Sequence, residues 1–289
     1  MESTPINEVR RIDDDLYVIT ETESVHCYVL VGRERALVFD IGYGYEDIRP
    51  LVHQITSLPL MLVVSHGDPD HALGCGWFDE VWVHPLDWGK VLANDTYDLR
   101  KRAIDYRLHK MPQLKGVIDE TAFLSRRIVG TRPHFLYAGD IIELGGVTLE
   151  VIHTPGHSYG HIMLLDAKHG RLFSGDQVTV HNVWYFNSSD EQAPFAQAVQ
   201  SLRSLLARRQ EYSSIYPAHD IFPVGHEVIE DQLYCFEHEL AETYMDDVPF
   251  VSFIGSGYQH RYRACELIYS DDRLAEWLGH SIERLGAGA

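Results

Sequence analysis

Cysteine is scarce in this sequence and never occurs in close pairs. The 289 residues contain four cysteines and no Cys-x-x-Cys motif. They are Cys27, Cys75, Cys235 and Cys265. Such wide spacing in a chain of this length argues against a disulfide framework and provides no rubredoxin-type cysteine site. We therefore expect four reduced, buried thiols.

Basic residues and long apolar runs are also lacking. Lysine and arginine total 24 against 43 aspartates and glutamates, a formal net charge of −19. Because excess carboxylates repel phosphate backbones and anionic lipid surfaces, we expect neither a nucleic-acid nor a membrane partner. Residues 1–5 do not resemble a signal peptide, and no apolar run approaches the roughly 18 residues needed to cross a bilayer. We expect a cytoplasmic protein with a small-molecule substrate, and a homodimer is left open.

The hydrophobic pattern predicts two β-rich blocks flanked by helices. Strands are expected within residues 16–20, 26–31, 36–39, 58–64 and 80–84, and later within 140–153, 162–165, 171–174 and 213–216. Helices are expected near residues 46–56, 86–92, 96–108, 192–209 and 226–244. This order is not a regular strand–helix alternation, so a Rossmann fold does not fit. Two packed sheets with helices outside, an α/β architecture, fit better.

The predicted domain is a single unit over residues 1–289, with its core at about 14–225. Residues 85–132 read as a helical insertion, for which a lid over a site and simple packing between strands are both open. Residues 226–289 form a C-terminal extension without a recognisable motif. Its helical start and the apolar run at 267–269 favour completion of the core.

A cluster of metal-ligand types directly follows the apolar run at 58–64. Four candidates fall within six residues: His66, Asp68, Asp70 and His71. A regular helix could not easily bring all four together, whereas an irregular loop shaped by Gly67 and Pro69 can spread them around two centres. Imidazole nitrogen and carboxylate oxygen both suit first-row divalent metals. This run therefore predicts a metal site.

Further polar blocks follow other expected strands. They are residues 153–161 (HTPGHSYGH), 173–176 (FSGD), 216–220 (YPAHD) and Asp40 after residues 38–39. Ligands placed repeatedly where apolar strands stop are typical of a rigid scaffold that holds a functional site.

Together these blocks resemble the metallo-β-lactamase superfamily over about residues 14–225. Its pattern is His-x-His-x-Asp-His, a histidine in a Thr-Pro-Gly-His turn, an aspartate after Ser/Thr-Gly, and a final histidine. The resemblance implies a four-layer αβ/βα sandwich and two divalent metal ions. The implied metal ligands are His66, Asp68, Asp70, His71, His157, Asp176 and His219. It also implies that Asp176 bridges both ions and that Asp40 orients a ligating histidine. His153 and His161 match no ligand position.

Asp68 departs from the family pattern, which has a histidine there. Two divalent ions carry four positive charges, of which Asp68, Asp70 and Asp176 would neutralise three rather than two. We expect weaker Lewis acidity and a less acidic bound water. The harder carboxylate also tilts preference from zinc toward iron or manganese. Zinc remains the expected metal, with iron or manganese as alternatives.

The implied site suits a metal-dependent hydrolase in which a metal-bridging hydroxide attacks a small ester, thioester or lactone. Asp70 could pass a proton. His181 and Tyr185, which follow Asp176, could contact the substrate or stabilise an oxyanion, and ordinary aromatic packing is the alternative.

Three rivals stay open. The first is a diiron redox protein that reacts with oxygen or nitric oxide, because the flavodiiron branch of the family resembles this chain in carrying a carboxylate (glutamate) at the position of Asp68. It would need a separate electron donor, since no flavodoxin-like domain or dinucleotide fingerprint is present. The second is a phosphodiesterase acting on a small molecule. The third, a sensor without catalysis, is disfavoured by the intact ligand set.

Overall fold

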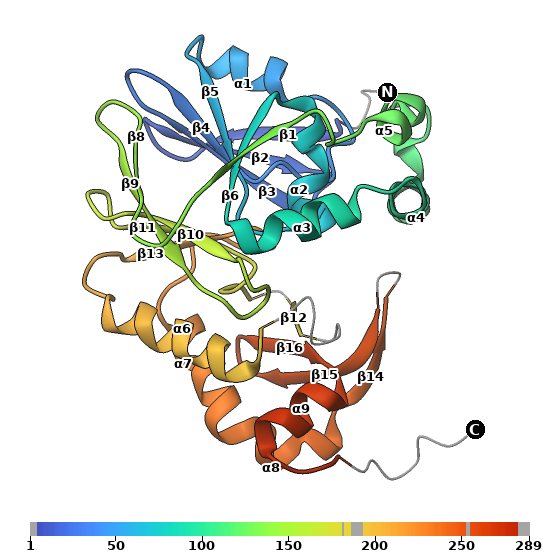
Figure 1. The fold of residues 1–289 in the computed structure, drawn as a ribbon, viewed down its shortest axis with the longest axis vertical. Coiled ribbons are helices and arrows are strands. Elements are labelled where there is room, and N and C mark those ends of the chain that lie inside the picture. The colour runs from blue at the N-terminus through green and yellow to red at the C-terminus, as the bar shows by residue number, and fades with distance from the viewer. Residues whose placement is uncertain (1–4, 181, 186–192, 253–254, 283–289) are drawn as a thin grey trace.

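The computed structural model describes residues 5–180, 182–185, 193–252 and 255–282, and its strands form three sheets with helices outside them (Figure 1). The first sheet runs in the order β1-β2-β3-β4-β5-β6-β7. Its strands are β1 (Asn7–Arg11), β2 (Leu16–Glu21), β3 (Val25–Val31), β4 (Ala36–Phe39), β5 (Leu60–Val63), β6 (Glu80–Val83) and β7 (Arg132–Phe135). β1 to β4 form an antiparallel meander, and β4 to β7 are parallel.

The second sheet runs in the order β13-β11-β10-β9-β8. Its strands are β8 (Ile141–Glu143), β9 (Thr148–His153), β10 (Ile162–Asp166), β11 (Arg171–Gly175) and β13 (Ser214–Pro217). One cluster of buried side chains joins it to the first sheet, with Leu30 and Phe39 on one side and Leu164 and Phe173 on the other. Burying both inner faces against each other removes a large apolar area from water, which drives the two sheets together.

Helices cover the two outer faces and complete four layers. On the first sheet lie α1 (Arg49–Ile55), α2 (Pro69–Ala72), η1 (Leu73–Trp77), α3 (Pro85–Asn94), α4 (Tyr97–Lys110), η2 (Pro112–Leu114) and α5 (Glu120–Ser125). On the second lie α6 (Phe195–Ala207) and α7 (Glu227–Tyr234). The predicted α/β sandwich is therefore confirmed. In the described residues no helix is both long and apolar enough to cross a membrane.

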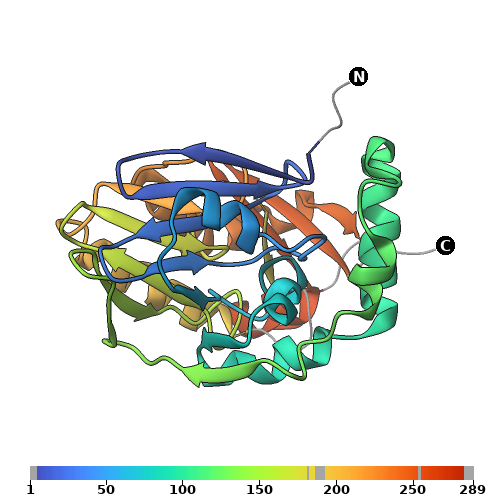
Figure 2. The same ribbon diagram turned by 90° about the horizontal axis from the view of Figure 1, so that it is seen from above.

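The insertion at 85–132 packs onto the first sheet. Figure 2 shows α4 and α5 together at one end of the molecule. The Thr96 side chain caps α4 by accepting a hydrogen bond from the backbone N–H of Leu99 at 3.1 Å. Ala103 and Ile104 on its inner face belong to the first apolar cluster. The packing alternative thus describes α4, and motion as a lid stays a prediction.

A third, four-stranded sheet was not expected from the sequence. Its order is β12-β16-β15-β14, with β12 (Asn182–Tyr185), β14 (Val248–Val251), β15 (Ser256–Tyr262) and β16 (Cys265–Tyr269). The remaining elements of the extension are the π-helical η3 (Cys235–Glu239), α8 (Leu240–Thr243), η4 (Tyr244–Asp246) and α9 (Asp271–Leu278). Phe236 and Leu267 share an apolar cluster with Met163 of the second sheet, so these parts of the extension pack onto that sheet.

Candidate metal centre

The candidate ligands lie on loops at the carboxyl ends of buried strands. After β5, an irregular loop carries His66 and ends at Asp68, which is the N-cap residue of the short helix α2. Pro69 at the first position of α2 favours a helix start there. The helix then places Asp70 and His71 on the following turn. The loop after β5 and the short helix α2 can therefore supply ligands to two neighbouring cation positions.

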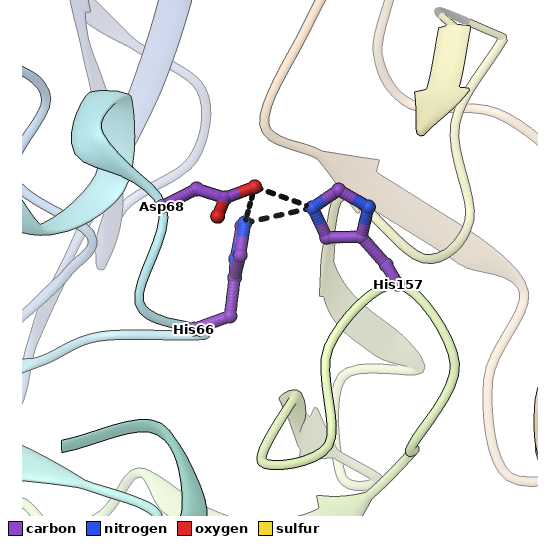
Figure 3. A group of neighbouring side chains, drawn as sticks. All are labelled: His66, Asp68 and His157. Carbon is purple, nitrogen blue, oxygen red and sulfur yellow. Dashed lines mark hydrogen bonds and ion pairs between the residues drawn. The ribbon is translucent and has the colours of Figure 1, made fainter. Parts of the chain in front are cut away.

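The first group of ligand atoms consists of Nε2 of His66, Oδ2 of Asp68 and Nε2 of His157, as Figure 3 shows. The Asp68 oxygen lies 2.8 Å from the His157 nitrogen and 3.4 Å from the His66 nitrogen. The two imidazole nitrogens are 3.1 Å apart. Three donors from two distant loops converge, which is an arrangement that can hold one cation.

The second group consists of Asp70, His71 and His219. Nε2 of His71 lies 3.8 Å from an Asp70 oxygen, and Nε2 of His219 lies 3.5 Å from the other. Asp176 stands between the groups. Its Oδ1 lies 3.2 Å from His71 and 3.3 Å from His219, whereas its Oδ2 lies 3.9 Å from Nε2 of His157. One carboxylate thus faces both groups.

All four histidines turn the same ring nitrogen toward the centre. Each Nδ1 has a hydrogen-bond partner in the protein, which leaves Nε2 pointing inward. The partners are Ser65 Oγ for His66 at 2.9 Å, Asp40 Oδ2 for His71 at 3.0 Å, Trp184 O for His157 at 3.0 Å and Ser24 O for His219 at 2.8 Å. An acceptor at Nδ1 selects the Nδ1–H tautomer and leaves a free lone pair on Nε2. Each of the four rings therefore presents an unprotonated Nε2 to the centre, as a metal ligand would require.

Asp40 organises one side of this arrangement. It follows β4 with a φ of 65°, in the left-handed region. Besides accepting from His71, its carboxylate accepts the backbone N–H of Ser65 at 2.6 Å and the Ser65 hydroxyl at 2.8 Å. Because that hydroxyl donates to Asp40, it accepts from the Nδ1–H of His66. The structure thus brings Asp40 to the position that the resemblance implies.

The electrostatic field at the centre favours positive charge. Burial alone lowers the pKa of His71, but Asp176, Asp70 and Asp40 raise it well above its ordinary value. Burial likewise opposes protonation of His219, yet Asp176 and Asp70 raise its pKa to about 9. Carboxylates that attract protons this strongly also attract cations, and the two compete for the same nitrogens.

Two buried atoms of the centre have no hydrogen-bond partner among the described residues. They are Nε2 of His71 and Oδ1 of Asp176. An unpaired buried polar atom is costly, and few occur in native proteins. A cation between the two atoms would satisfy both. Together with the donor types, this observation indicates that the residues fit a divalent cation between His71 and Asp176.

Asp68 has a partner that sequence reasoning missed. Its Oδ1, the oxygen directed away from the histidines, forms an ion pair with Nζ of Lys90 on α3. Burial by itself raises the pKa of Asp68, but the nearby Lys90 ammonium and the contacts with His157 and His66 hold it well below its usual range. A lysine on a predicted helix carries no signal of such a role, because only the packing of α3 on the loop reveals it.

Gly175 allows Asp176 to reach the centre. It has a φ of +51°, and a Cβ there would lie 2.7 Å from Nε2 of His161. The same His161 nitrogen accepts the backbone N–H of Asp176 at 3.3 Å, and Thr154 holds Nδ1 of His161 at 2.8 Å. His161 therefore supports the backbone and lies outside the ligand groups. His153 also lies outside them, stacked on His84 with ring centroids 4.1 Å apart.

The two remaining predicted catalytic side chains have different outcomes. His181 lies outside the described residues. Tyr185 is 1% exposed and its ring packs on Phe195 and Phe236, so the prediction that it contacts substrate is wrong. The Tyr185 hydroxyl accepts a hydrogen bond from Nε2 of Gln177 at 2.9 Å. Oε1 of the same Gln177 accepts the backbone N–H of His157 at 2.7 Å. Tyr185 thus helps to hold the backbone at His157 in place through Gln177.

A cavity of about 180 Å³ opens onto both groups of ligand atoms. Beyond the ligands, its wall includes Tyr43, Trp184 and two residues of α4, Tyr106 and Arg107. Asp70, with a side chain 24% exposed, faces this space. A small molecule with apolar and anionic parts would match such a wall.

The sequence profile of the Metallo-beta-lactamase superfamily matches residues 20–219, which include every candidate ligand. Two curated relatives are named acyl-coenzyme A thioesterase MBLAC2. The Gallus gallus protein is 32% identical over 163 residues, 52% of this chain and 56% of the relative. The Homo sapiens protein is 29% identical over 164 residues, 52% and 57% of the respective chains. The chain thus spans little more than half the length of these curated relatives.

Solved structures agree on the fold. A metallo-beta-lactamase from Pontibacter korlensis aligns with a TM-score of 0.55 at 16% identity, covering 78% of this chain and 97% of that chain. A metallo-beta-lactamase family protein from Thermus thermophilus aligns with a TM-score of 0.54 at 18% identity, covering 85% and 84%. At such identities the likeness speaks for the fold alone. With the profile match over more than half of its residues, the chain belongs to the metallo-beta-lactamase superfamily.

Proposed function

We propose that this chain is a dinuclear metal-dependent hydrolase of small thioesters, with esters and lactones as related substrates. One observation carries the metal-dependent part: four histidines present Nε2 to two points that share the carboxylate of Asp176. The names of the curated relatives support a thioester as the substrate class.

Two divalent ions, when bound, would activate a water molecule and polarise the scissile carbonyl. Asp70 faces His71 and His219 and borders the cavity, so its carboxylate can accept a proton from the attacking water and deliver it to the leaving group. A thiol has a pKa of about 8.5, so a thiolate leaves with little acid assistance. A thioester therefore demands less of the site than an amide would.

The cavity wall supports an acyl thioester with an anionic carrier. Tyr43, Tyr106 and Trp184 provide aromatic surface for an acyl chain. Arg107, a residue that is 8% exposed, adds a guanidinium group to this wall that suits a phosphate or carboxylate of the substrate. We propose that such a small molecule, rather than a polymer, is the substrate.

The test begins with metal content by plasma mass spectrometry on protein purified without chelator or added metal. We expect about two zinc ions per chain. Thiol release from acyl-coenzyme A substrates of increasing acyl length then measures hydrolysis, with Asp176→Ala as the inactive comparison and Asp105→Ala as a surface control. Esters, lactones and a phosphodiester complete the panel.

Two outcomes contradict the proposal. Mostly iron, with oxygen consumption in the presence of a reductant, would favour the diiron redox alternative that Asp68 raises. Turnover of the phosphodiester above that of every thioester would favour the phosphodiesterase.

A further inference from the structure

One face of α3 lies against the loop that carries the first ligands. Asp87, Lys90 and Asn94 are spaced three and four residues apart, so their side chains share one side of the helix. All three contact residues 67–68, the stretch between His66 and α2. Neither the family pattern nor the sequence analysis gives this helix face a role.

Asp87 and Asn94 hold the backbone of Gly67 from both sides. Oδ2 of Asp87 accepts the Gly67 N–H at 2.8 Å, and Nδ2 of Asn94 donates to the Gly67 carbonyl at 3.0 Å. The same Asp87 oxygen accepts the Ser158 hydroxyl at 2.7 Å, beside His157. A Cβ on Gly67 would lie 3.0 Å from Cβ of Lys90, so the helix and the loop pack closely. This bracing fixes where Lys90 stands relative to Asp68.

The two oxygens of Asp68 have separate partners. Oδ2 faces Nε2 of His66 and Nε2 of His157, the atoms that point to the first metal position. Oδ1 pairs with Nζ of Lys90. The Lys90 side chain is 10% exposed and that of Asp68 is 17% exposed, so little water screens the pair. The positive charge therefore sits directly behind the ligating oxygen.

Asp68 and Lys90 together have the same net charge as the neutral histidine that the family pattern has at the position of Asp68. A neutral histidine contributes no charge, Asp68 contributes one negative charge, and Lys90 contributes one positive charge. We propose that Asp68 and Lys90 form one functional unit, in which Lys90 is a positioning residue that offsets the charge of its ligand partner. The inference rests on the proposed dinuclear centre. It implies that the metal position keeps the charge of a typical family site, which revises the weaker Lewis acidity expected from Asp68 alone.

The test is a double-substitution cycle read out by zinc affinity, measured by competition with a chromophoric chelator and without any substrate. Asp68→His alone leaves Lys90 facing a divalent ion without its carboxylate, so we expect zinc affinity to fall at least about 10-fold. Adding Lys90→Met removes that repulsion and should recover most of the loss. Lys90→Arg keeps the charge and should retain most of the wild-type affinity. Lys101→Met, at an exposed ion pair, is the matched control.

Thermal unfolding and circular dichroism establish that each variant is folded. If Asp68→His does not fold, Asp68→Asn removes the charge at nearly the same volume and enters the same cycle. Additive effects of the two substitutions in folded protein would overturn the Asp68–Lys90 unit while leaving the hydrolase proposal intact. A wild-type protein that binds no divalent ion would instead overturn the dinuclear centre, and the inference with it.

Discussion

The carboxylate of Asp40 lies 3.0 Å from Nδ1 of His71 and so determines which nitrogen of that ring faces the candidate metal centre. The same carboxylate reaches His66 through the hydroxyl of Ser65. One buried acid, itself outside the ligand groups, therefore orients one candidate ligand in each of the two groups. This connection couples the two positions through protein atoms as well as through Asp176.

Asp40→Asn should weaken metal binding without removing a ligand. The amide replaces one acceptor by a donor, whereas Ser65 and His71 both donate to this side chain. Loss of a partner that orients a metal ligand typically costs about 10–100-fold in affinity. Chelator competition measures the change, and Asp105→Asn on the surface of α4 serves as the control. Unchanged affinity in Asp40→Asn would show that the tautomer of His71 is set by another group.

Asp176→Ala should remove at least one metal ion per chain and nearly all hydrolysis. Asp176 contacts His71 and His219 with one oxygen and approaches His157 with the other, so its loss affects both positions. Mass spectrometry of the purified variant gives the metal content, and thiol release gives the rate. Full metal content together with full activity would disprove a bridging role.

The free energy of unfolding of the metal-free protein should fall as the pH rises from about 6.5 to about 9. In metal-free protein, nearby carboxylates raise the pKa of His219 to about 9 from an ordinary 6.5 despite burial. A pKa raised in the folded state gives stability that is present in full below 6.5 and is lost as pH rises toward the folded value. The loss is on the order of 3 kcal/mol for this residue. His71, whose pKa is also raised, adds in the same direction.

Urea unfolding of chelator-treated and zinc-loaded protein at pH 6.5 and 9 measures this effect. Zinc replaces the proton on these nitrogens, so zinc-loaded protein should gain stability relative to the metal-free form as pH rises. Groups remote from the centre titrate alike in both forms, so their contributions to the pH dependence cancel when the two forms are compared. His219→Gln should flatten the pH dependence of the metal-free form. An equal pH dependence with and without zinc would contradict the assignment of His219.

Tyr185→Phe should leave hydrolysis within a few-fold of wild type. The hydroxyl of Tyr185 is buried and bonded to Gln177, so its removal costs about 1 kcal/mol of stability and no contact with substrate. Gln177→Ala should cost more, because it also releases the backbone N–H of His157. A loss of more than about 100-fold in kcat for Tyr185→Phe, with normal metal content, would restore the catalytic role first inferred from sequence.

Local sequence patterns predicted much of the fold. Most of the expected strands of both main sheets and the helices of the insertion are present, because alternating or continuous apolar runs reflect burial of each segment on its own. β1 and β7 escaped prediction because their residues are mostly polar or partly exposed edge positions. β12 pairs in parallel with β16, which lies about eighty residues later in the chain, and no local pattern encodes such a contact.

The sequence by itself determined where the ligand types stand, since the motif from His66 to His71 and the residues at later strand ends need only order and spacing to be recognised. Only the tertiary structure decided how they are held. Lys90 meets Asp68 because α3 packs on the loop, and backbone carbonyls of Ser24 and Trp184 select the tautomers of two histidines. Tyr185 turns into the core because its strand pairs with β16. Charge pairing, tautomer and side-chain direction depend on neighbours distant in sequence, and these neighbours meet only when the chain folds.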